Sequence, residues 1–114
     1  MVQIETQTLD QAALIIINGD IDASSSIQLD ESLSQQLKNK NLNIVIDCSG
    51  LNYISSAGLG VFMSYIEEFK ESNQKFVLFG LSEKVKNVFN MLGLDQLMNI
   101  VINKETALKF LDEE

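Results

Sequence analysis

Short apolar runs alternate along the chain with amphipathic segments, and this alternation restricts the folds that the chain can adopt. The runs are ALIIIN at residues 13–18, LNIVID at 42–47 and FVLFG at 76–80. Because each run is almost entirely apolar and rich in β-branched or aromatic residues, we expect strands that are buried on both faces. The segments between them predict crossover helices that join parallel strands. The sequence therefore predicts an α/β fold.

The helices are predicted from apolar residues that recur every three or four positions. The first should cover about residues 25–40, and the second should follow Ser56. A third is expected from Ser82 to Gly93, which is a natural C-terminal residue, and a short fourth near residues 107–111. The residues expected to face the core are Leu29, Leu33 and Leu37 in the first helix, Leu59, Phe62, Met63, Ile66 and Phe69 in the second, and Val85, Val88, Phe89 and Leu92 in the third.

Two further strands complete the expected order of elements. Residues 2–8 alternate with the period of a half-buried strand, and NIVIN at 99–103 is a short last strand. The order is then β-β-α-β-α-β-α-β-α, with a mixed, mostly parallel sheet that begins with a hairpin. Loops at 19–22, 47–56 and 80–82 should meet at the carboxyl edge of the sheet, where α/β proteins often carry their sites.

Composition limits the partners and the location. The 114 residues suit a single domain over residues 1–114, and the formal net charge of -8 would repel nucleic acid and anionic membranes. We therefore expect no nucleic-acid partner and no membrane. The one cysteine, Cys48, cannot form an internal disulfide, and the sequence shows neither a signal-peptide pattern nor an apolar run long enough to cross a bilayer. These features predict a cytoplasmic protein. Cys48 directly follows an apolar run, and we expect it to be a buried apolar residue.

The absence of histidine limits the chemistry, because it removes the usual general base, a common metal ligand and the Ser-His-Asp triad. The residues with the spacing of a calcium-binding loop are Asp20, Asp22, Ser24 and Glu31. However, Ser25 stands where such a loop needs glycine, and a strand instead of a helix precedes it. Gly58 and Gly60 lack the companion residues of a nucleotide-binding loop. We predict no metal, no cofactor and no catalytic residues, so we do not expect an enzyme.

Two adjacent serines, Ser55 and Ser56, stand where the polar continuation of the second apolar run gives way to a helix. Serine is a favoured N-cap residue, which gives the pair a purely structural interpretation. A helix N-terminus also favours an anion, so phosphorylation there would add almost two negative charges near Asp20, Asp22 and Asp47. Such a change would prevent a partner from docking without unfolding the domain. A nucleophilic serine is disfavoured because no base accompanies it.

Three segments together resemble a known family. These are NGDIDASSS at 18–26, VIDCSGLNYISSAGLGVF at 45–62 and LSEKVKNVFNMLGLDQLMNI at 81–100. They resemble the STAS domain and, more narrowly, the stand-alone bacterial anti-sigma factor antagonists. The resemblance covers nearly the whole chain and implies a β-sheet with helices packed mainly on one side.

The resemblance also implies a partner switch. An unphosphorylated family member binds an anti-sigma factor that has serine kinase activity and a histidine-kinase-like ATPase fold, and this binding releases a sigma factor. The kinase then phosphorylates one serine, the complex breaks, and a PP2C-type serine phosphatase reverses the modification. The family member is thus a substrate and a binding protein. The alternative is a constitutive STAS scaffold that phosphorylation does not control.

The family motif places the modified residue relative to Gly58. Aligned on that glycine, the phosphorylated position is Ser56, with Ser55 as the alternative acceptor. Ser55 replaces the acid of the family motif, and Ala57 replaces its following hydroxyl residue. The residues that we expect to contribute to partner binding are Asp20, Asp22, Asp47, Ser49, Ser55, Ser56, Gly58 and Leu59.

Overall fold

The computed structural model describes residues 2–39 and 42–112, and its elements follow the expected order. The strands are β1 (Val2–Thr8), β2 (Ala12–Ile21), β3 (Asn43–Ile54), β4 (Phe76–Phe79) and β5 (Asn99–Val101). The helices are α1 (Ser26–Lys38), α2 (Ser56–Glu71), α3 (Glu83–Met91) and α4 (Lys104–Asp112), with a short 3-10 turn, η1 (Leu94–Gln96), between α3 and β5. The predicted end of the first helix at Lys40 lies outside the described residues.

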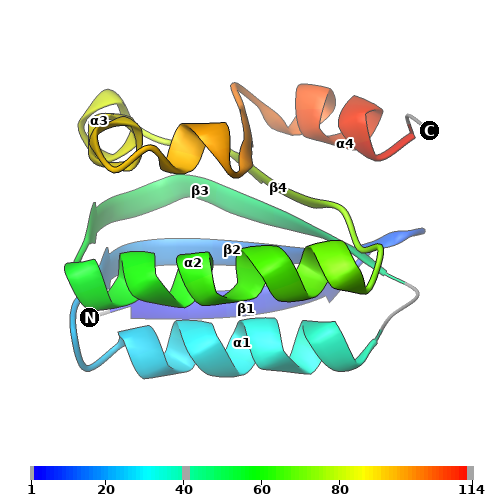
Figure 1. Cartoon of the computed structure of the whole chain (residues 1–114), viewed down its shortest axis with the longest axis horizontal. Coiled ribbons are helices and arrows are strands. Elements are labelled where there is room, and N and C mark those ends of the chain that lie inside the picture. Colours follow the sequence, from blue (N-terminus) through cyan, green and yellow to red (C-terminus); the bar gives the residue numbers. More distant parts are fainter. Residues whose placement is uncertain (1, 40–41, 113–114) are drawn as a thin grey trace.

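The strands form one sheet in which neighbours in sequence are neighbours in space, in the order β1-β2-β3-β4-β5. The hairpin pairs β1 with β2 in antiparallel fashion, whereas β2, β3, β4 and β5 are parallel to one another. Figure 1 shows this arrangement, with α1 and α2 side by side along the sheet. The predicted mixed, mostly parallel sheet is therefore confirmed.

Three of the four α-helices in the described residues contribute to the main core. Leu29 of α1, Phe62 of α2 and Phe89 of α3 are fully buried there against one face of the sheet. Helix α4 instead contributes Ala107 to a smaller cluster on the other face, together with Val45 and neighbouring residues of the sheet. The helices thus lie mainly on one side, as expected, and α4 is the exception.

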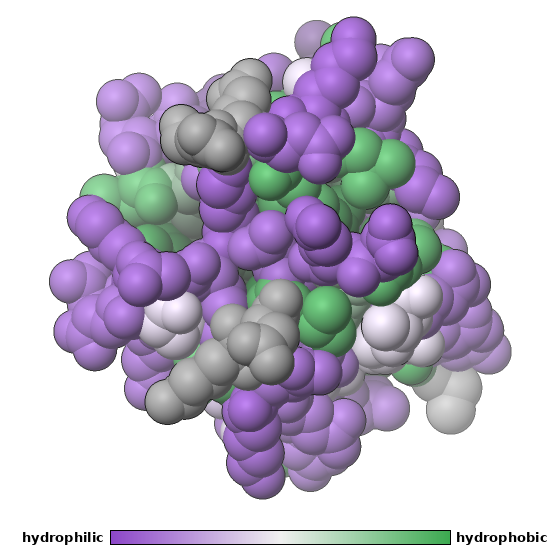
Figure 2. Space-filling view, turned by 90° about the vertical axis from the view of Figure 1, so that its right-hand side faces the viewer, coloured by the Kyte–Doolittle hydropathy of each residue, from purple (hydrophilic) through white to green (hydrophobic). Residues whose placement is uncertain are grey.

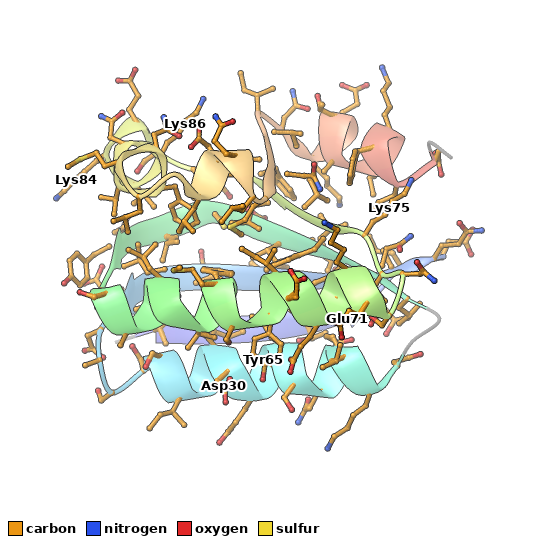
Figure 3. All side chains as sticks on the ribbon, in the orientation of Figure 1. Asp30, Tyr65, Glu71, Lys75, Lys84 and Lys86 are labelled. Carbon is orange, nitrogen blue, oxygen red and sulfur yellow. The ribbon has the colours of Figure 1, made fainter. Side chains whose placement is uncertain are left out.

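The predictions that Met63 and Leu92 face the core are wrong. Met63 is 50% exposed, because α2 turns Tyr65 inward, where its ring packs on Phe69. The Tyr65 hydroxyl donates to the Asp30 carbonyl oxygen at 3.3 Å and so joins α2 to α1 (Figure 3). Leu92 is 57% exposed, because Gly93 adopts a positive φ of 73° after α3 and the chain brings Leu94 into the core in its place.

The segment expected to be a loop at 47–56 is mostly strand. Strand β3 continues through its polar residues to Ile54, and β2 likewise continues past Gly19 to Ile21. Register shifts between the two strands accommodate this extension. The Asn18 side chain lies directly over Gly50, where a Cβ would clash with its oxygen. Polar residues therefore extend both strands well beyond their apolar runs.

A buried glutamine fixes the other end of the molecule. Gln74 is 4% exposed, and its Nε2 donates to the carbonyl oxygens of Gln36, Asn39 and Leu42 at 3.1, 3.0 and 2.7 Å. Its Oε1 accepts from the Ser72 hydroxyl at 2.6 Å. These bonds hold the end of α1 and the approach to β3 against the turn after α2.

Within the part of the chain that the structure describes, no helix combines the length and apolarity needed to cross a membrane.

Candidate functional site

The ends of β2 and β3 and the beginning of α2 meet at one edge of the sheet. Asp20 pairs in register with Tyr53, and Ile21 pairs with Ile54. The Ser55 N–H donates to the Ile21 carbonyl oxygen at 2.8 Å, which fastens the beginning of α2 to the end of β2. The segment after β4 lies beside the same strand, since Gly80 is next to Ser49 of β3, four residues before Tyr53.

Gly80 makes that last approach possible. It adopts a positive φ of 81°, and a Cβ there would lie 3.1 Å from both the Cβ and the backbone nitrogen of Ser49. A side chain would therefore be strained by its backbone conformation and crowded by Ser49. Glycine allows the chain leaving β4 to pass directly beside β3.

The structure separates the two serines. Ser55 is the N-cap of α2, with an extended backbone, and its hydroxyl oxygen accepts from the Gly58 N–H at 3.2 Å. Ser56 is the first residue of the helix and is exposed. Within residues 2–39 and 42–112, no hydrogen bond engages the Ser56 hydroxyl. One serine therefore serves the fold, and the other presents a hydroxyl to solvent.

Gly58 and Leu59 pack the first turn of α2 against the strand ends and the core. A Cβ on Gly58 would lie 2.7 Å from Ile21 Cγ2 and 2.8 Å from Ile54 Cγ1, so the first turn of α2 rests directly on the strand ends. Leu59 is 5% exposed and belongs to the main core. Both residues therefore hold the first turn of α2, and with it Ser56, in place, and their predicted contribution to partner binding stays a prediction.

Asp22 is occupied by the turn that leads into α1. Its Oδ1 accepts from the Ser25 N–H at 2.8 Å, the Ser25 hydroxyl at 2.8 Å and the Ser24 hydroxyl at 2.9 Å. These bonds, first of all those from Ser25, lower the pKa of the Asp22 carboxyl to about 2. Asp22 is exposed and ionised, yet its orientation is fixed by the turn.

Among the described residues, no group of three histidine, cysteine or acidic side chains is placed to hold a metal ion.

Asp47 and Ser49 form a second local pair. The N–H and the hydroxyl of Ser49 both donate to Asp47 Oδ1, at 2.9 and 2.5 Å. Asp47 is half-buried and Ser49 is exposed, so the pair presents a hydroxyl and a carboxylate near the Gly80 turn. Between them, Cys48 is fully buried, as predicted, and its burial together with the Asp47 charge raises the pKa of its thiol. The thiol is therefore not a reactive group.

The sequence analysis missed an apolar hollow that lies beside Ser56. This hollow, called the Tyr53 hollow below, has a volume of about 360 Å³. Its lining residues are Tyr53 and Ile54 of β3, Ser56 and Leu59 of α2, and Val88, Met91 and Leu92 at the end of α3. Met91 is 84% exposed and Tyr53 is 48% exposed. A sequence signal for the hollow existed in the two adjacent apolar residues Met91 and Leu92, which directly precede the helix-ending Gly93. The sequence analysis considered only Leu92 and predicted that it faces the core.

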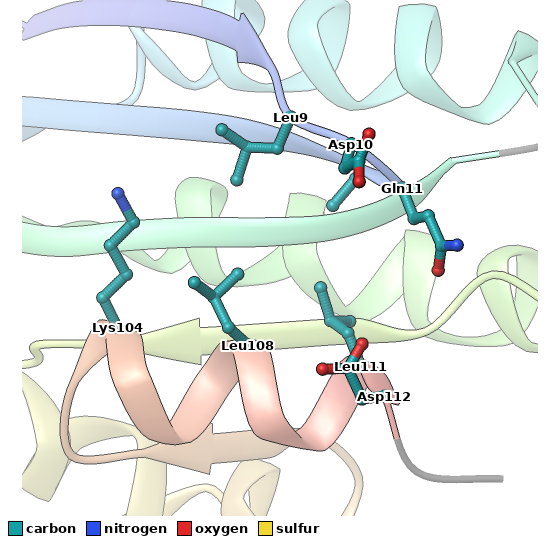
Figure 4. Close-up of a pocket in the computed structure, with 8 residues that line it drawn as sticks. Leu9, Asp10, Gln11, Lys104, Leu108, Leu111 and Asp112 are labelled. Carbon is teal, nitrogen blue, oxygen red and sulfur yellow. The ribbon is translucent and has the colours of Figure 1, made fainter.

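Another hollow, of about 410 Å³, lies at the opposite end of the sheet and contains none of the predicted site residues. Figure 4 shows Leu9 of the β1–β2 turn facing Leu108 and Leu111 of α4, with Asp10, Lys104 and Asp112 around them. Figure 2 views the side of the molecule that is on the right in Figure 1, and its surface is mainly hydrophilic with small, separated apolar areas.

Comparison with known proteins supports the resemblance to the STAS domain. The family model for the STAS domain matches residues 3–107. The anti-sigma-B factor antagonist of Listeria monocytogenes is 30% identical to the chain over 86 residues, which cover 75% of each protein.

Two solved structures show the same fold. An anti-sigma factor antagonist from Mycobacterium paratuberculosis superposes with a TM-score of 0.91 at 17% identity, covering 99% of this chain and 96% of that one. The Bacillus cell fate determinant SpoIIAA in its phosphorylated form superposes with a TM-score of 0.73 at 18% identity, covering 96% of this chain and 99% of that one. Since the family model spans nearly all of the sheet and its helices, the chain belongs to the STAS domain family.

Proposed function

We propose that the chain is an anti-sigma factor antagonist whose docking to an anti-sigma factor is switched by phosphorylation of Ser56. The names of the Listeria and Mycobacterium relatives support the first part. The observation that carries the second part is the different use of the two serines. Ser55 is engaged in capping α2, whereas Ser56 presents an exposed hydroxyl at the same helix end. A structural relative, SpoIIAA, is known in a phosphorylated form.

The modification would act locally. The Ser56 oxygen attacks the γ-phosphorus of ATP, its proton is lost and ADP leaves, which adds close to two negative charges. Because the hydroxyl is already exposed, the phosphate needs no space inside the fold. The free N–H groups and dipole of the α2 N-terminus favour an anion there. The fold is therefore retained, while the surface that a partner must cover acquires a strongly hydrated dianion.

The chemistry of the surface suits a protein partner. Net charge is -8, and Asp20 and Asp22 are both exposed near the N-terminus of α2. Such a surface favours a partner with a basic face. We propose as partners an anti-sigma factor with serine kinase activity and a histidine-kinase-like ATPase fold, and a PP2C-type serine phosphatase that removes the phosphate. The chain would act in the cytoplasm as a binding protein and not as an enzyme, without nucleic acid or membrane as a partner.

Mass spectrometry tests the switch. The purified chain is incubated with ATP and each serine-kinase anti-sigma factor encoded in the same genome, and the modified peptide is sequenced. We expect a single phosphate on Ser56, none on the Ser56→Ala variant, and continued modification of the Ser55→Ala variant. Phosphorylation of Ser56→Ala at an unchanged rate would contradict the assignment.

The constitutive scaffold remains the alternative, and Ser55 is the observation that favours it. Serine and aspartate are equally good N-caps, so replacement of the family's acid by Ser55 leaves the capping intact. It removes, however, a charge that a kinase could recognise. A chain isolated from growing and from stressed cells that stays bound to its partner and never carries phosphate would favour the scaffold.

A further inference from the structure

We infer that the Tyr53 hollow receives an apolar side chain of the protein partner, and that a phosphate on Ser56 prevents binding by standing at the mouth of this hollow. The inference rests on the proposed function and specifies how its surface recognises the partner. Three elements build the hollow: the end of β3, the first turn of α2 and the last turn of α3.

Exposure first singles out this hollow. Tyr53, Met91 and Leu92 are 48%, 84% and 57% exposed, so three large apolar side chains surround one depression of about 360 Å³. Single exposed apolar residues are ordinary, but a cluster around a concave surface is typical of an interaction site. Tyrosine is enriched among the residues that dominate binding energy, and methionine adapts its shape to a partner.

Charge indicates what kind of segment fits there. Asp20 does not line the hollow, but it is exposed and pairs in register with Tyr53, so its carboxylate is on the strand next to a lining residue. On the side of α3, Lys84 lies one turn before Val88, at the end of the molecule where α2 begins (Figure 3). We therefore expect a partner segment with one leucine, methionine or phenylalanine anchor and a basic residue beside it that meets Asp20.

Ser56 connects this contact to the switch. It lines the hollow itself, so a side chain that fills the hollow must also cover Ser56. An unmodified hydroxyl is small and uncharged, so covering it costs far less than covering an ionised group. A phosphate in the same place would have to lose its water against apolar walls, a cost that the N–H groups at the α2 N-terminus offset only in part because no lining residue is cationic. The phosphate would thus act by short-range desolvation, which salt screens far less than repulsion between exposed charges.

A binding experiment separates the two claims. The probe is the purified anti-sigma factor that phosphorylates Ser56, and its affinity for each variant is measured by isothermal titration calorimetry without ATP. We expect the Met91→Ala, Leu92→Ala double variant to bind at least about tenfold more weakly. The matched control is Ile102→Ala, because Ile102 is 81% exposed and does not line the hollow. It should bind within about twofold of the unaltered chain.

Each outcome has a defined meaning. If the unaltered chain binds the anti-sigma factor and the double variant binds it equally tightly, the role of the hollow in docking is refuted and the proposed function stands. If the unaltered chain binds none of the serine-kinase anti-sigma factors, the proposed function and the inference both fail. The Ser56→Glu variant should bind weakly at both low and high salt, and recovery of its affinity at high salt would refute the desolvation step. Unchanged melting temperatures of all variants verify that each is folded.

Discussion

Gly58 and Gly60 lie on the same helix, yet replacement of each by alanine should change stability in opposite directions. A Cβ on Gly58 would lie 2.7 Å from Ile21 Cγ2 and 2.8 Å from Ile54 Cγ1, whereas a Cβ on Gly60 meets nothing within 4 Å. Both substitutions gain helix propensity, which is worth about 0.5–1 kcal/mol. Only Gly58→Ala also forces apart a packed contact, and such overpacking costs about 1–3 kcal/mol.

The propensity gain is common to both variants, so the difference between them isolates the clash. Gly60→Ala should raise the free energy of unfolding by about 0.5–1 kcal/mol. Gly58→Ala should lie about 1–3 kcal/mol below Gly60→Ala. Urea unfolding followed by circular dichroism measures both, and melting temperatures should differ by roughly 4 °C per kcal/mol for a domain of this size. Equal stability of the two variants would show that α2 does not rest on the strand ends as described.

Two further changes test other parts of the structure. Gln74→Leu should lower the free energy of unfolding by about 1–3 kcal/mol, because the carbonyl groups of Gln36, Asn39 and Leu42 lose their shared donor. Gln35→Leu, an exposed control in α1, should change it by no more than about 0.5 kcal/mol in urea unfolding. The folded pKa of Asp22 is lowered from 3.8 to about 2, so its stabilising effect is present above pH 3.8 and is lost as pH falls toward 2. Asp22→Asn should therefore reduce the loss of stability over that pH range, and parallel pH profiles for the two proteins would contradict the role given to Asp22.

The fold was predictable because its signals are local. Apolar runs and three- to four-residue spacing identify the strands and helices from a few neighbouring residues, as at Leu29 and Phe62, which are fully buried. The extension of β2 and β3 was not predictable from those signals. It involves register shifts between the strands and the contact of Asn18 with Gly50, two residues on different strands that meet only in the folded sheet.

In the candidate site too, some features were predictable from the sequence and others depend on contacts that exist only in the folded protein. The family-like motif indicated Ser56, but the different uses of Ser55 and Ser56 became clear only from the cap bond to Gly58. Gly58 and Leu59 were predicted at the docking surface from the motif alone, and the structure shows that they also hold α2 on the sheet. The Tyr53 hollow was missed because its lining comes from three elements far apart in the sequence.

The central claim is that a phosphate on Ser56 breaks partner docking and leaves the fold intact. The most direct measurement compares the affinity of the kinase anti-sigma factor for the unmodified chain and for the chain phosphorylated at Ser56, alongside the melting temperatures of both forms. We predict a loss of affinity of at least about a hundredfold, in the upper part of the range of coupling between sites. We also predict melting temperatures within a few degrees of each other. Equal affinity of the two forms, or unfolding of the phosphorylated chain, would contradict the account.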